Sequence, residues 1–375
     1  MNAVFPTGFP PATAFYLVLL VATLLLHMVF MHYVLAGSAY LAVGRLMGRQ
    51  WCRRCGWQRL LVDWLPFATG LAITAGVAPL LFVQILYQRE FYSANLLLSH
   101  RWMAILPVLI VAFYLLYLQK SAWIGRRGWG WQIAVAATAF AGFAFIAWSW
   151  TENHLLSLDE AAWPTLYASG DLRYATAGLV ARLAVWFLAA FPTLAIELAW
   201  QGRLLGIPLS GPAAAGETVA GLSPLRRLAM TALAGLVGMA AAAAVYWPTL
   251  PAESREAIAG PLGRPWLVAA AAGVAVQVIC WLIAASRDRL PSGLATLATA
   301  GWLATLAGLV VLREAIRLAT VDLDTLAELH AEAAGIGGLP VFLIFAGLNA
   351  AAIVWCIRMV ARRAVTPEPG SRSGS

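Results

Sequence analysis

Charged side chains are scarce in this chain of 375 residues, where Asp, Glu, Lys and Arg together make up 11%. The mean hydropathy is +0.78. Soluble domains carry about a quarter charged residues, so the composition excludes an ordinary soluble domain. The net charge of +8 is explained by the arrangement of loops around a membrane, and we expect no nucleic acid partner.

Cysteine is also rare, with four residues. Cys52 and Cys55 form one CxxC pair. It lacks the second pair that a zinc site needs and the following histidine that covalent haem attachment needs. Phosphate-binding loops, zinc-protease motifs and serine-nucleophile motifs are absent as well. The sequence therefore gives little support to chemistry on a polar substrate.

The chain does contain apolar runs long enough to cross a bilayer, which takes about 20 helical residues. We predict an all-α polytopic membrane protein of about nine transmembrane helices, with a single helical-bundle domain over residues 1–363. The Pro/Gly/Ser-rich end, 364–375, is expected to be a disordered cytoplasmic tail. The predicted spans are 13–43, 61–87, 102–119, 130–149, 174–200, 227–247, 265–286, 292–318 and 338–361.

Basic residues gather in every second connection between these spans and after the last one. The positive-inside rule places those connections in the cytoplasm, which puts the N-terminus outside and the C-terminus in the cytoplasm. Acidic residues gather in the opposite loops, including the longest predicted outer loop, about 150–173. We therefore expect a multi-pass protein of a bacterial-type inner (cytoplasmic) membrane, with the lipid bilayer as its surroundings.

Histidine is scarce, with five residues in all, and two of them lie inside the first span. An ionisable side chain at membrane depth marks a functional site by default, and imidazole is a usual ligand of haem iron. His27 and His32 are five residues apart, or about 140° around a helix, so they cannot face one small site together. The alternative for each is a ring hydrogen-bonded to a neighbouring helix.

A second candidate site lies in the outer half of the eighth predicted span, where Arg313, Glu314 and Arg317 fall within one helical turn. Glu314 and Arg317 are spaced to pair. Buried charges of this kind serve haem propionates, a quinone head group or a proton path, whereas at a helix end they form a simple interfacial ion pair. Gln84, near the outer end of the second span, could line a quinone or haem-edge pocket; the alternative is ordinary packing or the polarity of a solvated helix end. His100, His154, His330 and Arg182 are weaker candidates on the outer side.

Four short motifs resemble subunit I of the cytochrome bd-type quinol oxidases. They are His27-Met-Val-Phe-Met-His-Tyr-Val-Leu-Ala-Gly-Ser, Thr74-Ala-Gly-Val-Ala-Pro79 with Phe82-Val-Gln84, Phe145-Ile-Ala-Trp-Ser-Trp150, and Glu314-Ala-Ile-Arg317. The resemblance implies nine spans with the N-terminus outside, and a haem-ligand histidine at His27. It also implies an iron-ligand role for Glu314 and contact between Arg317 and the haem propionate region.

The chain departs from that family in the fifth predicted span, which has no histidine, and in the seventh, which has no methionine. Residues 248–264 are too few for the family's quinol-binding loop. The resemblance then implies one or two haems b rather than the full oxygen-reducing set.

The resulting hypothesis is a quinol-linked oxidoreductase subunit that passes electrons between quinol or quinone and an outer-side partner, such as a cytochrome c or another subunit. The alternatives are a haem-free scaffold or anchor subunit of a redox complex and, less favoured, a transporter.

Overall fold

The computed structural model describes residues 9–48, 56–207, 222–287, 289–321, 326–331 and 338–365. The regular structure in these ranges is helical. Eight of the described helical segments are long and apolar enough to cross a membrane. The prediction of an all-α polytopic membrane protein is thereby confirmed in outline, while the ninth crossing and the orientation stay predictions.

The helices begin and end close to the predicted spans. They are α1 (Pro11–Leu46), α3 (Gly56–Leu86), α4 (Gln88–Met103), α5 (Ile105–Lys120), α6 (Ala122–Gly125), α7 (Trp129–Leu156), η1 (Glu160–Ala162), α8 (Trp163–Ser169), α9 (Ala177–Leu204), α10 (Pro224–Tyr246), η3 (Trp247–Thr249), α11 (Ala252–Ala259), α12 (Arg264–Ala285), α13 (Ser292–Leu318) and α15 (Gly338–Val365).

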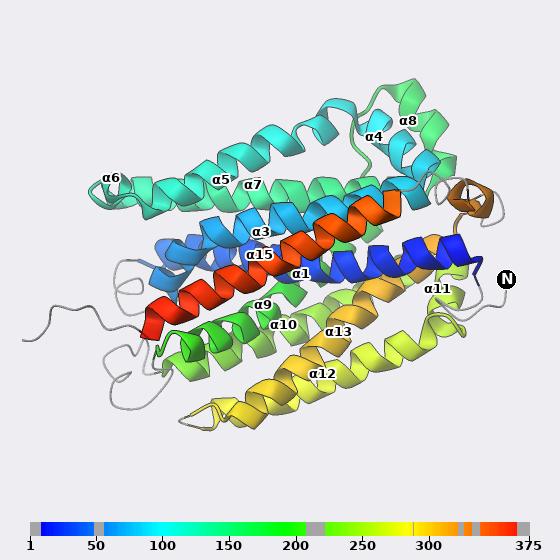
Figure 1. The fold of residues 1–375 in the computed structure, drawn as a ribbon. Helices are drawn as coiled ribbons and strands as arrows, with labels where there is room; N and C mark the ends of the chain where they lie inside the picture. Colours follow the sequence, from blue (N-terminus) through cyan, green and yellow to red (C-terminus); the bar gives the residue numbers. More distant parts are fainter. Residues whose placement is uncertain are drawn as a thin grey trace, which may run out of the picture.

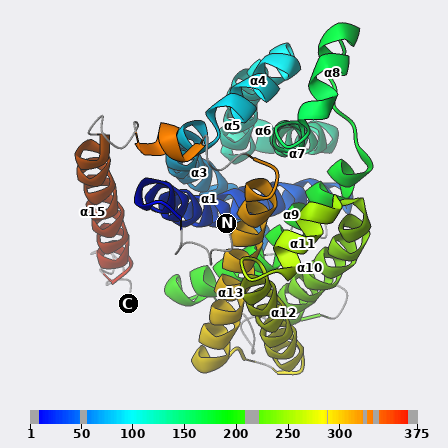
Figure 2. The same ribbon diagram turned by 90° about the vertical axis from the view of Figure 1, so that its right-hand side faces the viewer.

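The long helices form one elongated bundle in which α1 lies between two groups (Figures 1 and 2). On one side, α1 packs along α3, and α5 packs along α7; on the other, α9 packs along α10 and α12 along α13. The short helices α8 and α11 lie at the end of the bundle where α1 begins, and α6 lies at the opposite end. Side chains from both groups therefore meet along α1.

The predicted outer loop at 150–173 begins too early. Helix α7 continues to Leu156, so Glu152 and His154 are helical and buried. The helix continues because its polar end has partners: Glu152 forms an ion pair with Arg101 at 2.9 Å, and Asn153 donates to Asn95 at 2.7 Å. The prediction ended this helix at its first polar residues because it relied on apolar character alone.

The third crossing also begins earlier than predicted, because helical residues run from Gln88 to Lys120 rather than from 102. Helices α4 and α5 make up this segment, and the backbone is broken at Ser99, which has a positive φ of 42°. The predicted end of the second span, at 87, is close to the observed end of α3 at Leu86.

Helix α15 covers the ninth predicted span but makes little contact with the bundle and stands apart from it in Figure 2. Almost every described side chain from Val341 to Met359 is exposed. One contact is the edge-to-face pair of Phe342 with Phe82, at 5.2 Å between ring centroids. Its described apolar part, Val341–Cys356, is shorter than the other eight. Cys52, Cys55 and most of the predicted tail (366–375) lie outside the described residues.

Glycines allow α12 and α13 to approach each other closely. A Cβ built on Gly273 would lie 2.4 Å from the carbonyl oxygen of Gly301 and 2.6 Å from the Thr305 hydroxyl oxygen. Gln277, one turn after Gly273, donates to Thr305 at 3.0 Å, so the tight contact also satisfies a buried amide. In a membrane such close packing replaces the hydrophobic effect as the force between helices.

We predict that Gly273→Val separates α12 from α13 and destabilises the protein by about 1–3 kcal/mol or more, because the side chain would overlap backbone atoms. Thermal unfolding in detergent, followed by near-UV circular dichroism, measures the loss. Gly293→Ala in the first turn of α13 is the control, since a Cβ there meets nothing within 4 Å. Equal melting temperatures for the two variants would contradict the close-packing argument.

Candidate functional site

Glu314 on α13 is the centre of a buried polar cluster near the end of the bundle where α1 begins. Its side chain has no exposed surface. One carboxylate oxygen pairs with Arg313, and the other accepts a hydrogen bond of 3.1 Å from the hydroxyl of Tyr87 and lies 3.9 Å from Arg317. The ion pair predicted between Glu314 and Arg317 is thus present. Both oxygens of Glu314 are engaged by protein groups.

Arg317 connects this cluster to α7. Its guanidinium lies over the ring of Tyr87, 4.5 Å from the centroid, and it donates to Nδ1 of His154. Arg317 and His154 are 4% and 3% exposed. The cluster therefore joins α13, the α3–α4 junction and α7 through side chains that are almost fully withdrawn from solvent.

A third arginine extends the cluster toward α10. Arg182 on α9 is buried and donates to the hydroxyl of Tyr246 at 3.0 Å. Arg182 contributes to the electrostatic environment of both His154 and Arg313. Within the described residues, the cluster then holds three guanidiniums and one carboxylate. Buried charge of one sign is costly unless it is compensated, so this cluster favours a ligand with negative charge or acceptor oxygens.

The partners of His154 fix what its second nitrogen can do. A guanidinium has only donors, so Nδ1 of His154 must be the acceptor and the neutral ring carries its hydrogen on Nε2. That Nε2 is buried without a hydrogen-bond partner in the described part of the chain, as are Nε and Nη1 of Arg317. The unsatisfied atoms of His154 and Arg317 are thus all donors.

His27 has the opposite arrangement. Its Nδ1 lies 3.0 Å from the carbonyl oxygen of Ala72 on α3, and because a carbonyl only accepts, Nδ1 is the donor. Nε2 then carries a lone pair, for which the described residues offer no hydrogen-bond donor. Gly76 makes room for the ring, because a Cβ there would lie 2.9 Å from Cε1 of His27. A ring oriented through Nδ1 with Nε2 free is the usual form of a metal-ligating histidine.

His32 faces a different set of helices. Its Nδ1 lies 3.0 Å from the hydroxyl of Thr193 on α9, and that hydroxyl also accepts from Trp302 on α13 at 2.9 Å. The ring has no exposed surface, and Nε2 has no hydrogen-bond partner among the described residues. His27 and His32 thus serve separate neighbours, as their spacing on the helix predicts.

The structure also separates His27 from Glu314. His27 contacts α3 at Ala72 and Gly76, whereas Glu314 contacts Tyr87, just after α3 ends at Leu86. Ten helical residues from Gly76 to Leu86 span about 15 Å. Ligands of one metal ion lie within a few ångström of it, so His27 and Glu314 do not share one iron.

Gln84 is partly buried on α3, three residues before Tyr87, and makes no hydrogen bond with the described residues. The sequence singled out Arg313, Glu314 and Arg317 together, and the structure brings them together. The sequence pattern marked His154 and Arg182 only as weaker candidates, and it did not mark Tyr87 or Tyr246 at all. The role of an intramembrane Tyr or His can be assigned only when its hydrogen-bond partner on another helix is known.

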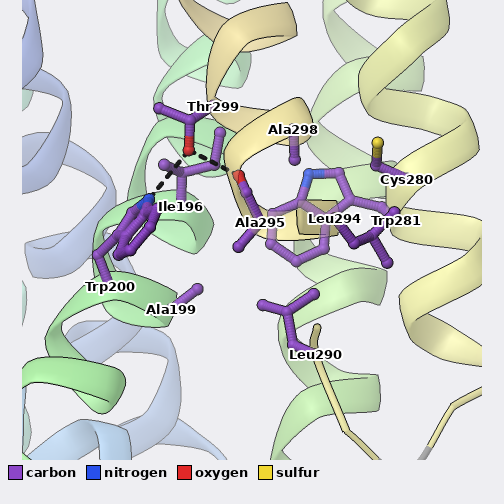
Figure 3. A pocket seen from close by; sticks show the side chains of 10 residues that line it. All are labelled: Ile196, Ala199, Trp200, Cys280, Trp281, Leu290, Leu294, Ala295, Ala298 and Thr299. Atoms are coloured by element: carbon purple, nitrogen blue, oxygen red, sulfur yellow. Dashed lines mark hydrogen bonds between the residues drawn. The ribbon is translucent and has the colours of Figure 1, made fainter. Parts of the chain in front are cut away.

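A small cavity lies elsewhere, between α9, α12 and α13 (Figure 3). Its volume is about 10 Å³, room for about one water molecule. Trp200 donates to Thr299 beside it at 2.9 Å, and the Nε1 of Trp281 is buried without a partner in the described part of the chain. The cavity is too small for an organic cofactor and is distinct from the cluster around Glu314.

No family model matches this chain, and no curated protein matches it. The likeness to cytochrome bd subunit I therefore rests on the short motifs alone.

We predict that Glu314→Gln destabilises the protein by about 3–5 kcal/mol, because it leaves buried guanidiniums without their carboxylate. Thermal unfolding in detergent measures the effect. Glu160→Gln is the matched control: Glu160 pairs with Arg89 at 2.8 Å, but both side chains are exposed. Its expected cost is about 0–1 kcal/mol. A loss from Glu314→Gln no larger than the control's would show that the cluster is solvated.

His330, outside the eight apolar segments, links the helical residues 326–331 to the bundle. Its Nε2 donates to the Leu86 carbonyl at 3.1 Å, and its Nδ1 accepts from the hydroxyl of Thr13 at 2.8 Å. Burial lowers the pKa of His330 below its ordinary value of 6.5, and the bond to Leu86 only partly offsets this.

Because the folded state holds His330 neutral, the attachment of 326–331 should weaken as pH falls below about 6.5, the ordinary value of this group. Above that pH, titration of His330 should not change how firmly residues 326–331 are attached. Amide hydrogen exchange of 326–331 across pH measures the effect, after correction for the intrinsic exchange rate. His330→Gln should remove the pH dependence, and an unchanged dependence in that variant would assign it to another group.

Proposed function

We propose that this protein is the membrane subunit of a respiratory-type electron-transfer complex, which binds haem b and exchanges electrons between quinol and an outer-side redox partner. The observation that carries the proposal is the opposite chemistry of two histidines, the partly buried His27 and the buried His154. His27 presents a lone pair, and His154 presents a hydrogen beside a cluster with surplus positive charge. The nine crossings and the N-outside orientation belong to the same proposal.

His27 is the residue that would hold the haem iron. Its Nδ1–H bond to Ala72 fixes the ring and leaves Nε2 to bind. Bound haem supplies one-electron chemistry, while the protein sets its potential through the axial ligand and the surrounding charge. Glu314, whose two oxygens are both engaged, serves in this proposal as the counter-ion of the arginines.

In this proposal, the cluster around Glu314 binds a ligand that is rich in hydrogen-bond acceptors. The Nε2–H of His154 and the free N–H groups of Arg317 are suited to a quinone carbonyl or to a propionate carboxylate. Gln84, three residues before Tyr87, is a further candidate for this ligand site. Burial of these donors strengthens each bond they make, since the local dielectric constant is low.

The alternatives make different demands on the same residues. A haem-free scaffold or anchor subunit needs no free nitrogen at His27. A transporter would use Arg182 and Glu314 along a substrate path.

We predict that the purified full-length protein shows the reduced-minus-oxidised absorption bands of haem b and that His27→Ala loses them. The physical reason is the removal of the one lone pair that the ring offers to iron. His100→Ala is the control, because His100 is an exposed histidine. Absence of the bands from the wild-type protein would favour the scaffold, and full haem content in His27→Ala would remove His27 from the site. Reduction of the haem by added quinol then tests entry of electrons from the membrane pool.

A further inference from the structure

The turn that joins α5 to α7 brings exposed arginine and tryptophan side chains together. It contains α6 and lies at the end of the bundle opposite to the start of α1 (Figure 1). Trp123 and Trp131 are 52% and 63% exposed, and Arg126 and Arg127 are exposed as well. Because α5 and α7 belong to segments long enough to cross a membrane, the turn lies where the hydrocarbon meets the head groups. Tryptophan is enriched at that interface, and basic side chains there attract anionic lipids.

Hydrogen bonds hold this turn in one shape. The side-chain nitrogen of Gln132 donates to the carbonyl oxygens of Gly125 and Arg127, at 3.4 and 3.3 Å. Arg45, near the end of α1, donates to the side-chain oxygen of Gln132 at 2.8 Å. The turn is thus tied both to α7 and to α1, so its surface is formed before any ligand binds.

Two arginines at this end of the bundle lie over tryptophan rings. The guanidinium of Arg127 is 4.4 Å from the ring centroid of Trp123, and that of Arg45 is 5.4 Å from the centroid of Trp129. A contact with the face of a ring leaves the N–H groups at the edge of a guanidinium available. Those groups match two oxygens of a phosphate. The rings thereby position the cations without neutralising them.

The arginines of this surface have no acidic partner. Among the described residues, no carboxylate forms an ion pair with Arg45, Arg126 or Arg127. Asp63, on α3, is paired with Lys120 at 3.3 Å. Three guanidiniums therefore leave a positive surface at this end of the bundle.

Exposed arginines at the opposite end of the bundle are different. Arg89 pairs with Glu160 at 2.8 Å, and Arg173 pairs with Asp171 at 3.7 Å. The same type of side chain is thus neutralised within the chain at one end and is left to a ligand at the other.

An apolar hollow begins directly after Arg127 in the chain. It is lined by Gly128, Gly130, Trp131 and Ala134 and has a volume of about 340 Å³. A Cβ built on either glycine would meet nothing within 4 Å, so the hollow is open where side chains are lacking. An apolar wall gives no advantage to a free phosphate ion, but it stabilises the methylene groups of a lipid next to its head group.

We infer that this turn is a binding site for an anionic phospholipid of the surrounding bilayer. Arg126 and Arg127 hold the lipid phosphate, while the hollow at Gly128 and Gly130 receives the adjoining part of an acyl chain. The inference goes beyond the proposed function, since it needs α5 and α7 to cross the membrane but needs neither haem nor quinol. A failed haem measurement would therefore leave it unaffected.

Native mass spectrometry of the full-length protein in detergent, with lipid added, tests the choice of ligand. The wild type should bind phosphatidylglycerol more tightly than phosphatidylcholine with the same acyl chains, because only the former has a net negative charge. Equal affinities for the two lipids would overturn the proposal. Glycerol phosphate, which has no acyl chain, should bind more weakly than phosphatidylglycerol; equal binding would assign the site to a free phosphate instead.

Removal of the two cations tests the position of the site. Arg126→Gln combined with Arg127→Gln should weaken phosphatidylglycerol binding by about 30-fold, the effect of two basic residues at an anionic surface. Arg89→Gln combined with Arg173→Gln is the matched control. It removes the same charge from the opposite end, where carboxylates already neutralise it, and should leave the affinity unchanged. Equal losses in the two double variants would show that net charge alone attracts the lipid and would overturn the proposal.

A substitution that fills the hollow tests the acyl-chain contact. Gly130→Leu should weaken phosphatidylglycerol binding several-fold, whereas Gly125→Leu should not. Both glycines are helical, and a Cβ at either meets nothing within 4 Å, but Gly125 does not line the hollow. Neither change is expected to unfold the protein, since leucine favours a helix more than glycine does. Unchanged affinity in Gly130→Leu would overturn the assignment of the hollow to a lipid.

Discussion

The ion pair of Glu314 with its flanking arginines is the interaction on which one end of the bundle, where α1 begins, depends. Glu314 is the one carboxylate among the described residues that touches both Arg313 and Arg317, and it also holds the hydroxyl of Tyr87. Through Arg317 the same contacts reach His154 on α7. A stretch of one helical turn thereby fixes how α13 meets the α3–α4 junction and α7. Because the compensation is incomplete, a ligand with negative charge would be stabilised by the same cluster that orders this end of the bundle.

The histidines show how a membrane protein assigns different chemistry to one type of side chain. Each ring has two nitrogens, and the group bound to the first decides what the second offers. A carbonyl partner leaves His27 with a lone pair, and a guanidinium partner leaves His154 with a hydrogen. For His330 both nitrogens are occupied, which suits a structural role. None of these differences is visible in the residue type or in its depth along a span.

Much of the fold could be predicted from the sequence, because crossing a bilayer requires long apolar helices and such segments are easily recognised in the sequence. The boundaries failed where polar residues were buried by partners from distant parts of the chain. Glu152 and His154 looked like loop residues, and only Arg101 and Arg317 explain why the helix continues through them. The candidate site was predictable where its residues are close together in the sequence, whereas the helix boundaries depend on contacts with distant residues. Arg313, Glu314 and Arg317 are local in sequence, whereas Tyr87 and His154 join them through tertiary contacts.

The hydroxyl of Thr193 has a consequence for how the bundle responds to charge. It uses its one hydrogen and both lone pairs, on Ala189, Trp302 and His32, so it ties three helices together with no bonding capacity left over. The nitrogen of His32 that takes part in this junction already carries its hydrogen. A proton that arrives on the other nitrogen would therefore alter the electric field inside the bundle without breaking a single bond between helices.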